Sequence, residues 1–131
     1  MPTITADFNH GHNHGPIFSR GENAVDRPVN DRRAPSINVR AYAPALYAHI
    51  NAVNRLRRSP WACAEAQALS KLLWYIRRAG YVIDLSRITF GRPTGYDGAE
   101  LWTPCENCLE WLEQAGGWGP DVTYRIRPEL Q

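Results

Sequence analysis

Two short cysteine motifs set the strongest constraint on how this chain folds. Cys63 and Glu65 belong to a Cys-Ala-Glu run, and Cys105 and Cys108 form a Cys-x-x-Cys pair. Three cysteines do not make a disulfide framework, and Cys-x-x-Cys spacing favours metal or redox chemistry. Both motifs begin segments that look helical, and a helix N-terminus stabilises thiolates, the form that binds metal. We therefore expect a fold that brings two helix N-termini to one point.

The chemistry of these four side chains predicts a zinc site. Three thiolates would supply three ligands and leave the fourth tetrahedral position to water, as in catalytic rather than structural zinc sites. Glu65 is the only acidic residue between Asp31 and Asp84, and a carboxylate beside such water can move protons. Two other interpretations stay open: a structural zinc site closed by His49 or an N-terminal histidine, or three unligated core cysteines.

The helix signals are clear in the middle of the chain. Ser59 and Pro60 suit an N-cap and a first helical position, and Gly80 suits the end of that helix. Thr103 and Glu106 have the spacing of a capping box. The predicted helices cover residues 43–58, 60–79 and 103–116, and the predicted strands are Thr3–Phe8, Ile17–Phe18, Ile37–Val39, Tyr81–Leu85, Ile88–Phe90, Leu101–Trp102 and Val122–Ile126.

This order of elements predicts an α/β fold in a single domain, residues 1–131. Residues 1–42 are rich in Gly, Pro, Asn and Arg and form an irregular part that contains the first strands. Residues 43–131 form the core with both cysteine motifs. Because helices separate the later strands, we expect an α-β-α sandwich with a mixed sheet of about five strands and two zinc-bearing helices. The run His10, His12 and His14 is either a metal binder or a flexible loop.

Composition limits the location of the protein. The chain is 44% apolar and 21% charged, as is usual for globular proteins. It contains no run of roughly 20 apolar residues that could span a bilayer. The N-terminus lacks the basic start and apolar run of a secretory signal. We therefore expect a cytoplasmic monomer without membrane contacts.

The net charge of +2 is spread unevenly along the chain. Residues 43–80 carry five arginines and one lysine against one acid, for +5, whereas residues 81–131 carry four arginines against eight acids, for −4. Arginine suits bidentate phosphate contacts, so the basic segment predicts either a nucleic-acid contact or a solvated helix face. Under the first interpretation the candidate phosphate ligands are Arg55, Arg57, Arg58, Arg77 and Arg78.

The two motifs resemble those of the cytidine deaminase superfamily. The matching runs are Cys63-Ala64-Glu65 and Pro104-Cys105-x-x-Cys108, and the likeness spans roughly residues 60–127. The pattern Cys-Ala-Glu-x-x-Ala-Leu that starts at Cys63 is similar to the deaminase domains of bacterial polymorphic toxins. The run Trp102-Thr103-Pro104-Cys105 resembles that of deaminases acting on polynucleotides. The free-cytidine enzymes have an arginine after the last cysteine, whereas Leu109 stands here, and a helix replaces the family's hairpin before the first motif.

The resemblance implies roles for individual residues. Zn²⁺ would be held by Cys63, Cys105 and Cys108, and Glu65 would be the proton shuttle. The base pocket would be lined by Ala64, Trp102 and Thr103. It further implies a hydrolytic deaminase that converts cytosine to uracil in DNA or RNA, with an immunity protein as partner and delivery to a target cell if the chain is a toxin domain. The alternatives are a deaminase of free cytidine, deoxycytidine or a nucleoside antibiotic, and a non-catalytic zinc-stabilised module that binds nucleic acid.

Overall fold

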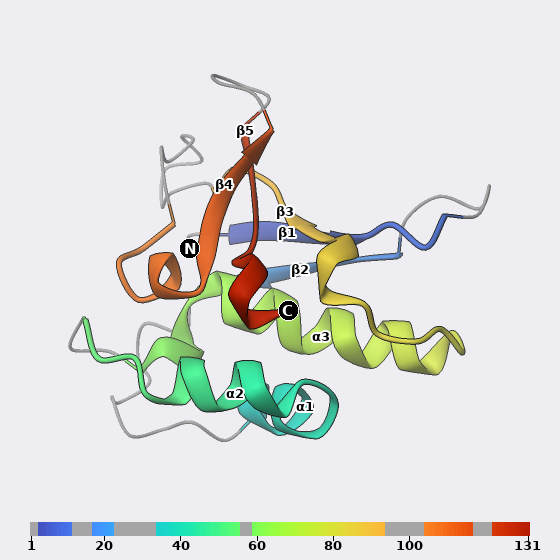
Figure 1. The fold of residues 1–131 in the computed structure, drawn as a ribbon, viewed down its shortest axis with the longest axis horizontal. Coiled ribbons are helices and arrows are strands. Elements are labelled where there is room, and N and C mark those ends of the chain that lie inside the picture. The colour runs from blue at the N-terminus through green and yellow to red at the C-terminus, as the bar shows by residue number, and fades with distance from the viewer. Residues whose placement is uncertain (1–2, 12–16, 23–33, 56–58, 94–103, 117–121) are drawn as a thin grey trace.

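A five-stranded antiparallel sheet forms one layer of the protein. The computed structural model describes residues 3–11, 17–22, 34–55, 59–93, 104–116 and 122–131 (Figure 1). The strand order is β2-β1-β3-β5-β4, and all four pairings are antiparallel. The strands are β1 (Thr3–Phe8), β2 (Ile17–Glu22), β3 (Ile88–Phe90), β4 (Leu112–Gly116) and β5 (Val122–Ile126). The α/β class and a sheet of about five strands are confirmed. Four of these strands were predicted from the sequence, whereas β4 lies where a helix was predicted.

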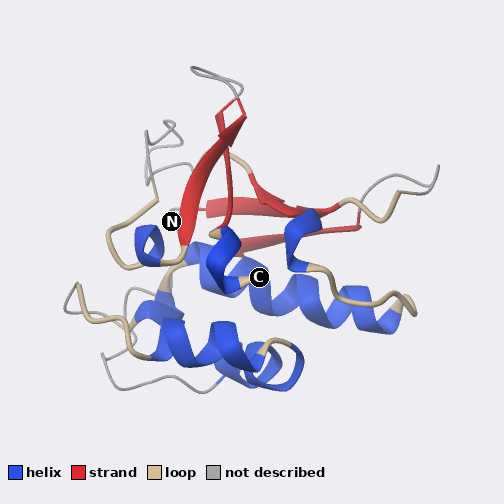
Figure 2. Cartoon of the chain, in the orientation of Figure 1, coloured by secondary structure: helices blue, strands red, loops and turns tan. Residues whose placement is uncertain are grey.

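Three α-helices form the rest of the described framework. They are α1 (Ala34–Tyr42), α2 (Pro44–Asn51) and α3 (Ala64–Arg78). Helix α3 packs directly against β1 and β2, and α1 packs against α3 (Figure 2). Short 3₁₀ turns complete the description: Pro60–Ala62, Leu85–Arg87, Cys108–Glu110 and Pro128–Leu130. No helix in the described ranges has the length and apolar character to cross a lipid bilayer.

The core lies between the sheet and α3. Alternate residues of β1 and β5 are buried, which is the pattern of an antiparallel sheet with one face covered and the other facing water. The stripe predicted for the middle helix, Leu69, Leu72, Leu73 and Ile76, is fully buried. Burial of this stripe fixes the rotation of α3, and therefore where its N-terminal residues point.

The layering and strand directions differ from the predicted sandwich with a mixed sheet. In the described part of the chain, α1, α2 and α3 all lie on one side of the sheet (Figures 1 and 2). A parallel pair needs a crossover of a dozen or more residues, usually a helix. The segment between β4 and β5 is too short for one, and these strands pair directly as antiparallel neighbours.

The predicted helix at residues 103–116 is also wrong, so only one of the two zinc-bearing helices exists. One helical turn, with Leu109 N donating to Cys105 O at 3.0 Å, is followed by a 3₁₀ turn and then by β4. Pairing of β4 with β5 buries Leu112 against the core, and the Arg125 side chain pairs with Glu113 across the strands at 2.6 Å. This tertiary pairing overrides the local helix signal.

Three further predicted elements differ from the observed ones. The predicted strand Ile37–Val39 lies inside α1, because Val39 is buried and Asn38 Nδ2 donates to Ser70 O of α3 at 3.2 Å. The predicted strand at 81–85 is irregular and leads into a 3₁₀ turn, whose N-cap Asp84 accepts a hydrogen bond from Ser86 N. The predicted helix at 43–58 ends at Asn51. The predicted strand Leu101–Trp102 lies outside the described residues.

Gly21 of β2 lets the sheet approach α3 very closely. A Cβ atom at this position would overlap Ala64 O and lie 2.5 Å from Ala68 N. The neighbouring Ser19 hydroxyl donates to Ala68 O at 2.5 Å. Only a glycine fits between this strand and the first turns of α3, so Gly21 sets the position of the helix start.

We expect Gly21→Ala to destabilise the fold by about 2–3 kcal/mol or more, because overpacking at a rigid backbone contact has no side chain to relieve it. Chemical denaturation would measure the free energy of unfolding. Gly91→Ala is the matched control, since its nearest atom would be Thr5 O at 3.8 Å, and its expected effect is within about 0.5 kcal/mol. Equal stability of the two variants would contradict this packing.

Candidate metal centre

The first half of the site is built at the start of α3. The Ser59 hydroxyl accepts a hydrogen bond from Trp61 N at 3.2 Å and caps a turn that Pro60 begins. The capping role was predicted, but the turn is a separate 3₁₀ turn and not the start of the long helix. Cys63 follows in extended conformation and is the N-cap residue of α3. Glu65 lies in the first turn of the helix and is only 3% exposed. The turn therefore places a thiol and a carboxylate at the same helix end.

The second half of the site is the turn that contains the other two cysteines. Asn107, between them, is fully buried, and its Oδ1 accepts a hydrogen bond from Arg55 N at 3.0 Å. The Arg55 side chain pairs with Glu110 Oε1 at 3.0 Å. His49 of α2 contacts the carbonyl of the same residue, with Nε2 at 2.9 Å. These contacts tie the cysteine turn to α2 and to the segment that follows it.

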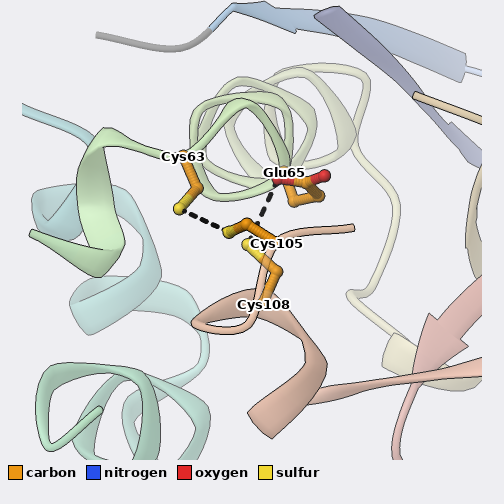
Figure 3. Close-up of side chains that lie close together, drawn as sticks. All are labelled: Cys63, Glu65, Cys105 and Cys108. Carbon is orange, nitrogen blue, oxygen red and sulfur yellow. Dashed lines mark hydrogen bonds between the residues drawn. The ribbon is translucent and has the colours of Figure 1, made fainter. Parts of the chain in front are cut away.

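The structure brings the four predicted side chains into one cluster (Figure 3). The Sγ atoms of Cys63 and Cys105 are 3.0 Å apart, and Cys108 Sγ donates to Glu65 Oε2 at 3.2 Å. One ligand atom from each residue lies within 4.8 Å of all the others. Cys63 and Cys108 are buried and Cys105 is partly exposed, so the cluster opens toward solvent at Cys105.

This donor set fits a metal ion. Zn–S bonds of about 2.3 Å in tetrahedral geometry place sulfur atoms about 3.8 Å apart. The observed spacing of up to 4.8 Å, with one pair at 3.0 Å, needs shifts of about 1 Å at most to reach that geometry. Thiolates select zinc and other soft or borderline metals over magnesium or calcium. Cys63, Glu65, Cys105 and Cys108 can therefore hold a metal ion.

No histidine among the described residues joins the cluster. The only set of possible ligands found there consists of the three cysteines and Glu65. His49 contacts a backbone carbonyl instead. The His10 ring stacks on Tyr81 with 4.7 Å between centroids. His12 and His14 lie outside the described residues. His49 therefore does not close a structural zinc site, which was one interpretation of the sequence.

Two of the three thiols in the cluster, those of Cys63 and Cys108, have raised pKa values. The hydrogen bond with Cys105 is the largest cause that raises the pKa of Cys63 from 9.0 to about 12, and burial adds to the shift. Burial is the main cause that raises the pKa of Cys108 well above its ordinary value of 9.0. A metal ion must displace these protons when it binds.

Metal affinity is therefore expected to rise with pH, by about tenfold per pH unit for each proton released. A competition titration with a chromophoric zinc chelator at several pH values measures this slope. A zinc affinity that does not change with pH would contradict protonated thiols in the free site.

The protein without zinc should also lose stability as pH rises from 9.0 to about 12, because the folded state binds the Cys63 proton more tightly than the unfolded chain does. Chemical denaturation at several pH values measures this loss.

The three described members of the set of arginines predicted to contact phosphate lie in two separate places. Arg55 pairs with Glu110 beside the cysteine turn. Arg77 and Arg78 lie at the opposite end of α3 from Glu65, about 18 Å away for twelve residues at about 1.5 Å each. Arg57 and Arg58 lie outside the described residues.

Of the predicted pocket residues, Trp102 and Thr103 also lie outside the described ranges. Ala64 is 2% exposed at the first position of α3, directly beside two of the cluster residues in sequence. Its contact with a base stays a prediction.

Two residues that shape the site were not singled out from the sequence. Asn107 could have been noticed, because it is a polar residue inside the Cys-x-x-Cys motif. It is fully buried, so it needs a hydrogen-bond partner, which is Arg55 N. Gly21 carried none, because its role depends on how closely β2 approaches α3.

Comparison with known proteins gives no relative: no family model, curated protein or solved structure matches this chain. The likeness to the cytidine deaminase superfamily therefore stays a prediction carried by the two cysteine motifs. The function has to be argued from the geometry of the cluster.

Proposed function

We propose that this protein is a zinc-dependent hydrolytic deaminase that converts cytosine to uracil. The observation that supports the proposal is a buried carboxylate, Glu65, inside a cluster of three cysteines and no histidine among the described residues. Three sulfur ligands leave one position of a tetrahedral ion to solvent, and Cys105 marks an open side. A carboxylate beside that position suits proton transfer in hydrolysis.

Each residue has a defined task in this proposal. Cys63, Cys105 and Cys108 hold the ion, which when bound supplies an activated water. Glu65 would take a proton from that water as its oxygen adds to the ring carbon bearing the amine, and would give this proton to the ring nitrogen. It would then take the remaining proton of the added hydroxyl and give it to the amine, which leaves as ammonia. Glu65 Oε2 accepts a hydrogen bond from Cys108 Sγ at 3.2 Å, so the carboxylate lies beside the position that the ion would occupy.

The proposed substrate is a cytosine within DNA or RNA. The net charge of +5 over residues 43–80 favours a polyanion. Trp102 and Thr103 would contact the base, as the resemblance implies. Arg55 is the described candidate nearest the cluster. To bind a phosphate, its side chain would have to release Glu110, with which it forms an ion pair. A toxin role with an immunity protein remains part of the proposal through the resemblance alone.

A second candidate is supported by one observation. Glu65 lies within 4.8 Å of all three sulfurs, so it can itself be the fourth ligand of a closed structural site. Such a module would bind zinc and nucleic acid without chemistry. It predicts four protein ligands on the ion and unfolding of the domain upon chelation.

The proposal is tested by measuring uracil formation by the zinc-loaded protein. Four substrates are compared side by side: single-stranded DNA, duplex DNA, RNA and free cytidine. Turnover on a polynucleotide but not on cytidine supports it. Turnover on cytidine alone supports a free-nucleoside deaminase instead. Absence of uracil from every substrate, with zinc bound at full occupancy, would favour the closed structural site.

A further inference from the structure

Far from the metal cluster, an aromatic and cationic hollow lies where α1 ends beside the last turn of α3. It has a volume of 440 Å³ and is lined by Tyr42, Trp74, Arg77 and Arg78. Tyr42 is 37% exposed and Trp74 40% exposed. The guanidinium of Arg78 lies over the Trp74 ring, 4.8 Å from its centroid. The proposed proton transfer uses none of these four side chains, although Arg77 and Arg78 belong to the arginines predicted from the sequence to contact phosphate.

A second, apolar pocket adjoins this hollow, because Tyr42 lines both. The second pocket measures 510 Å³ and is lined mainly by aliphatic side chains from the start of α2, the segment after α3 and the C-terminus: Leu46, Val82, Ile83, Leu85 and Leu130. Val82 is 79% exposed. We call the two together the Tyr42 face.

The charge of the Tyr42 face is unbalanced. Among the described residues, neither Arg77 nor Arg78 forms an ion pair with a carboxylate, and Arg77 Nη1 instead donates to Tyr81 O at 3.4 Å. The one acidic residue that lines the face, Asp84, pairs with Arg87 at 3.4 Å. Among the residues that the structure describes, the face therefore presents two arginines that pair with no carboxylate, beside exposed aromatic and aliphatic surface.

We propose that the Tyr42 face docks an acidic protein segment that carries an apolar anchor residue. Trp, Tyr and Arg are the residues most enriched at the energetic centres of protein interfaces. Carboxylates of the partner would pair with Arg77 and Arg78, and its anchor would fill the aliphatic pocket. A phosphate backbone would satisfy the arginines but would leave that pocket empty, so the combination favours a protein over a nucleic acid. This proposal does not depend on the deaminase activity.

Selection from a display library of random peptides tests the proposal. Peptides are selected on the zinc-loaded wild-type protein, and those that also bind the double variant Trp74→Ala/Arg78→Glu are removed. The expected result is a family of peptides with Asp or Glu around an apolar residue. Each single variant, Trp74→Ala and Arg78→Glu, should weaken a selected peptide by about tenfold or more in fluorescence anisotropy. Arg20→Glu, an exposed charge reversal on β2, is the matched control and should bind the peptide like wild type.

Recovery of no peptide, of peptides without acidic residues, or of peptides that bind the variants equally well would overturn the proposal. The same variants are also tested with a single-stranded oligonucleotide. Loss of oligonucleotide binding in Arg78→Glu, without selected peptides, would assign the face to nucleic acid instead. Circular dichroism and zinc content of each variant confirm that the fold and the metal centre are intact.

Discussion

Glu65→Gln is expected to abolish uracil formation while zinc stays bound. Gln keeps the size of the side chain and its place beside Cys108 but cannot take up or release a proton at neutral pH. Loss of a general acid–base group lowers rates on the order of 10²–10⁴-fold. Turnover and zinc content are measured on the same preparation, because a proton shuttle is identified only if turnover is lost while zinc stays bound.

Glu106→Gln is the matched control for this change. Glu106 lies between Cys105 and Cys108 in sequence but is exposed and is not part of the cluster. We expect its substitution to leave both turnover and zinc content unchanged. Unchanged turnover in Glu65→Gln would contradict the shuttle role. Loss of zinc together with turnover would show that Glu65 is a metal ligand, as the closed structural site requires.

Cys108→Ser is expected to remove the metal. Cys108 is fully buried, so no solvent-exposed group can replace its thiolate, and a serine hydroxyl is a poor ligand for zinc. The zinc content should fall from about one ion per chain to near zero. The wild-type protein should gain about 4 kcal/mol of stability at zinc concentrations about 1,000-fold above its Kd, and the variant should gain none.

Thermal unfolding with and without added zinc measures this difference. The expected zinc-dependent increase in Tm of the wild-type protein is roughly 10–20 °C. Ser70→Ala, on α3 but outside the cluster, should keep the full increase. A Cys108→Ser variant that binds zinc as tightly as wild type would show that the ion is held elsewhere in the chain.

Each half of the metal cluster could be predicted from the sequence because its chemistry is local, whereas the contact of Cys63 with Cys105 joins residues that are far apart in sequence. Cys63 and Glu65 lie on either side of one helix start, and Cys105 and Cys108 lie in one turn, so each pair is placed by short-range structure. The buried stripe of α3 was predictable for the same reason, since periodicity alone fixes which face of a helix is apolar.

The second helix and the sheet directions were not predictable in this way. The signals after Cys108 favour a helix locally, and only the pairing of β4 with β5 makes the strand more stable. The contact of Gly21 with α3 likewise joins residues that are far apart in sequence. Contacts of this kind depend on the whole fold, and a single sequence carries no periodic signal for them.

The most direct test of the metal centre is X-ray absorption at the zinc edge of the purified, zinc-loaded protein. We expect three sulfur ligands at about 2.3 Å and one oxygen ligand at about 2.0 Å, with the oxygen retained in Glu65→Gln because it comes from water. A spectrum with nitrogen ligands from histidine, or with fewer than three sulfurs, would contradict the cluster of Cys63, Cys105 and Cys108.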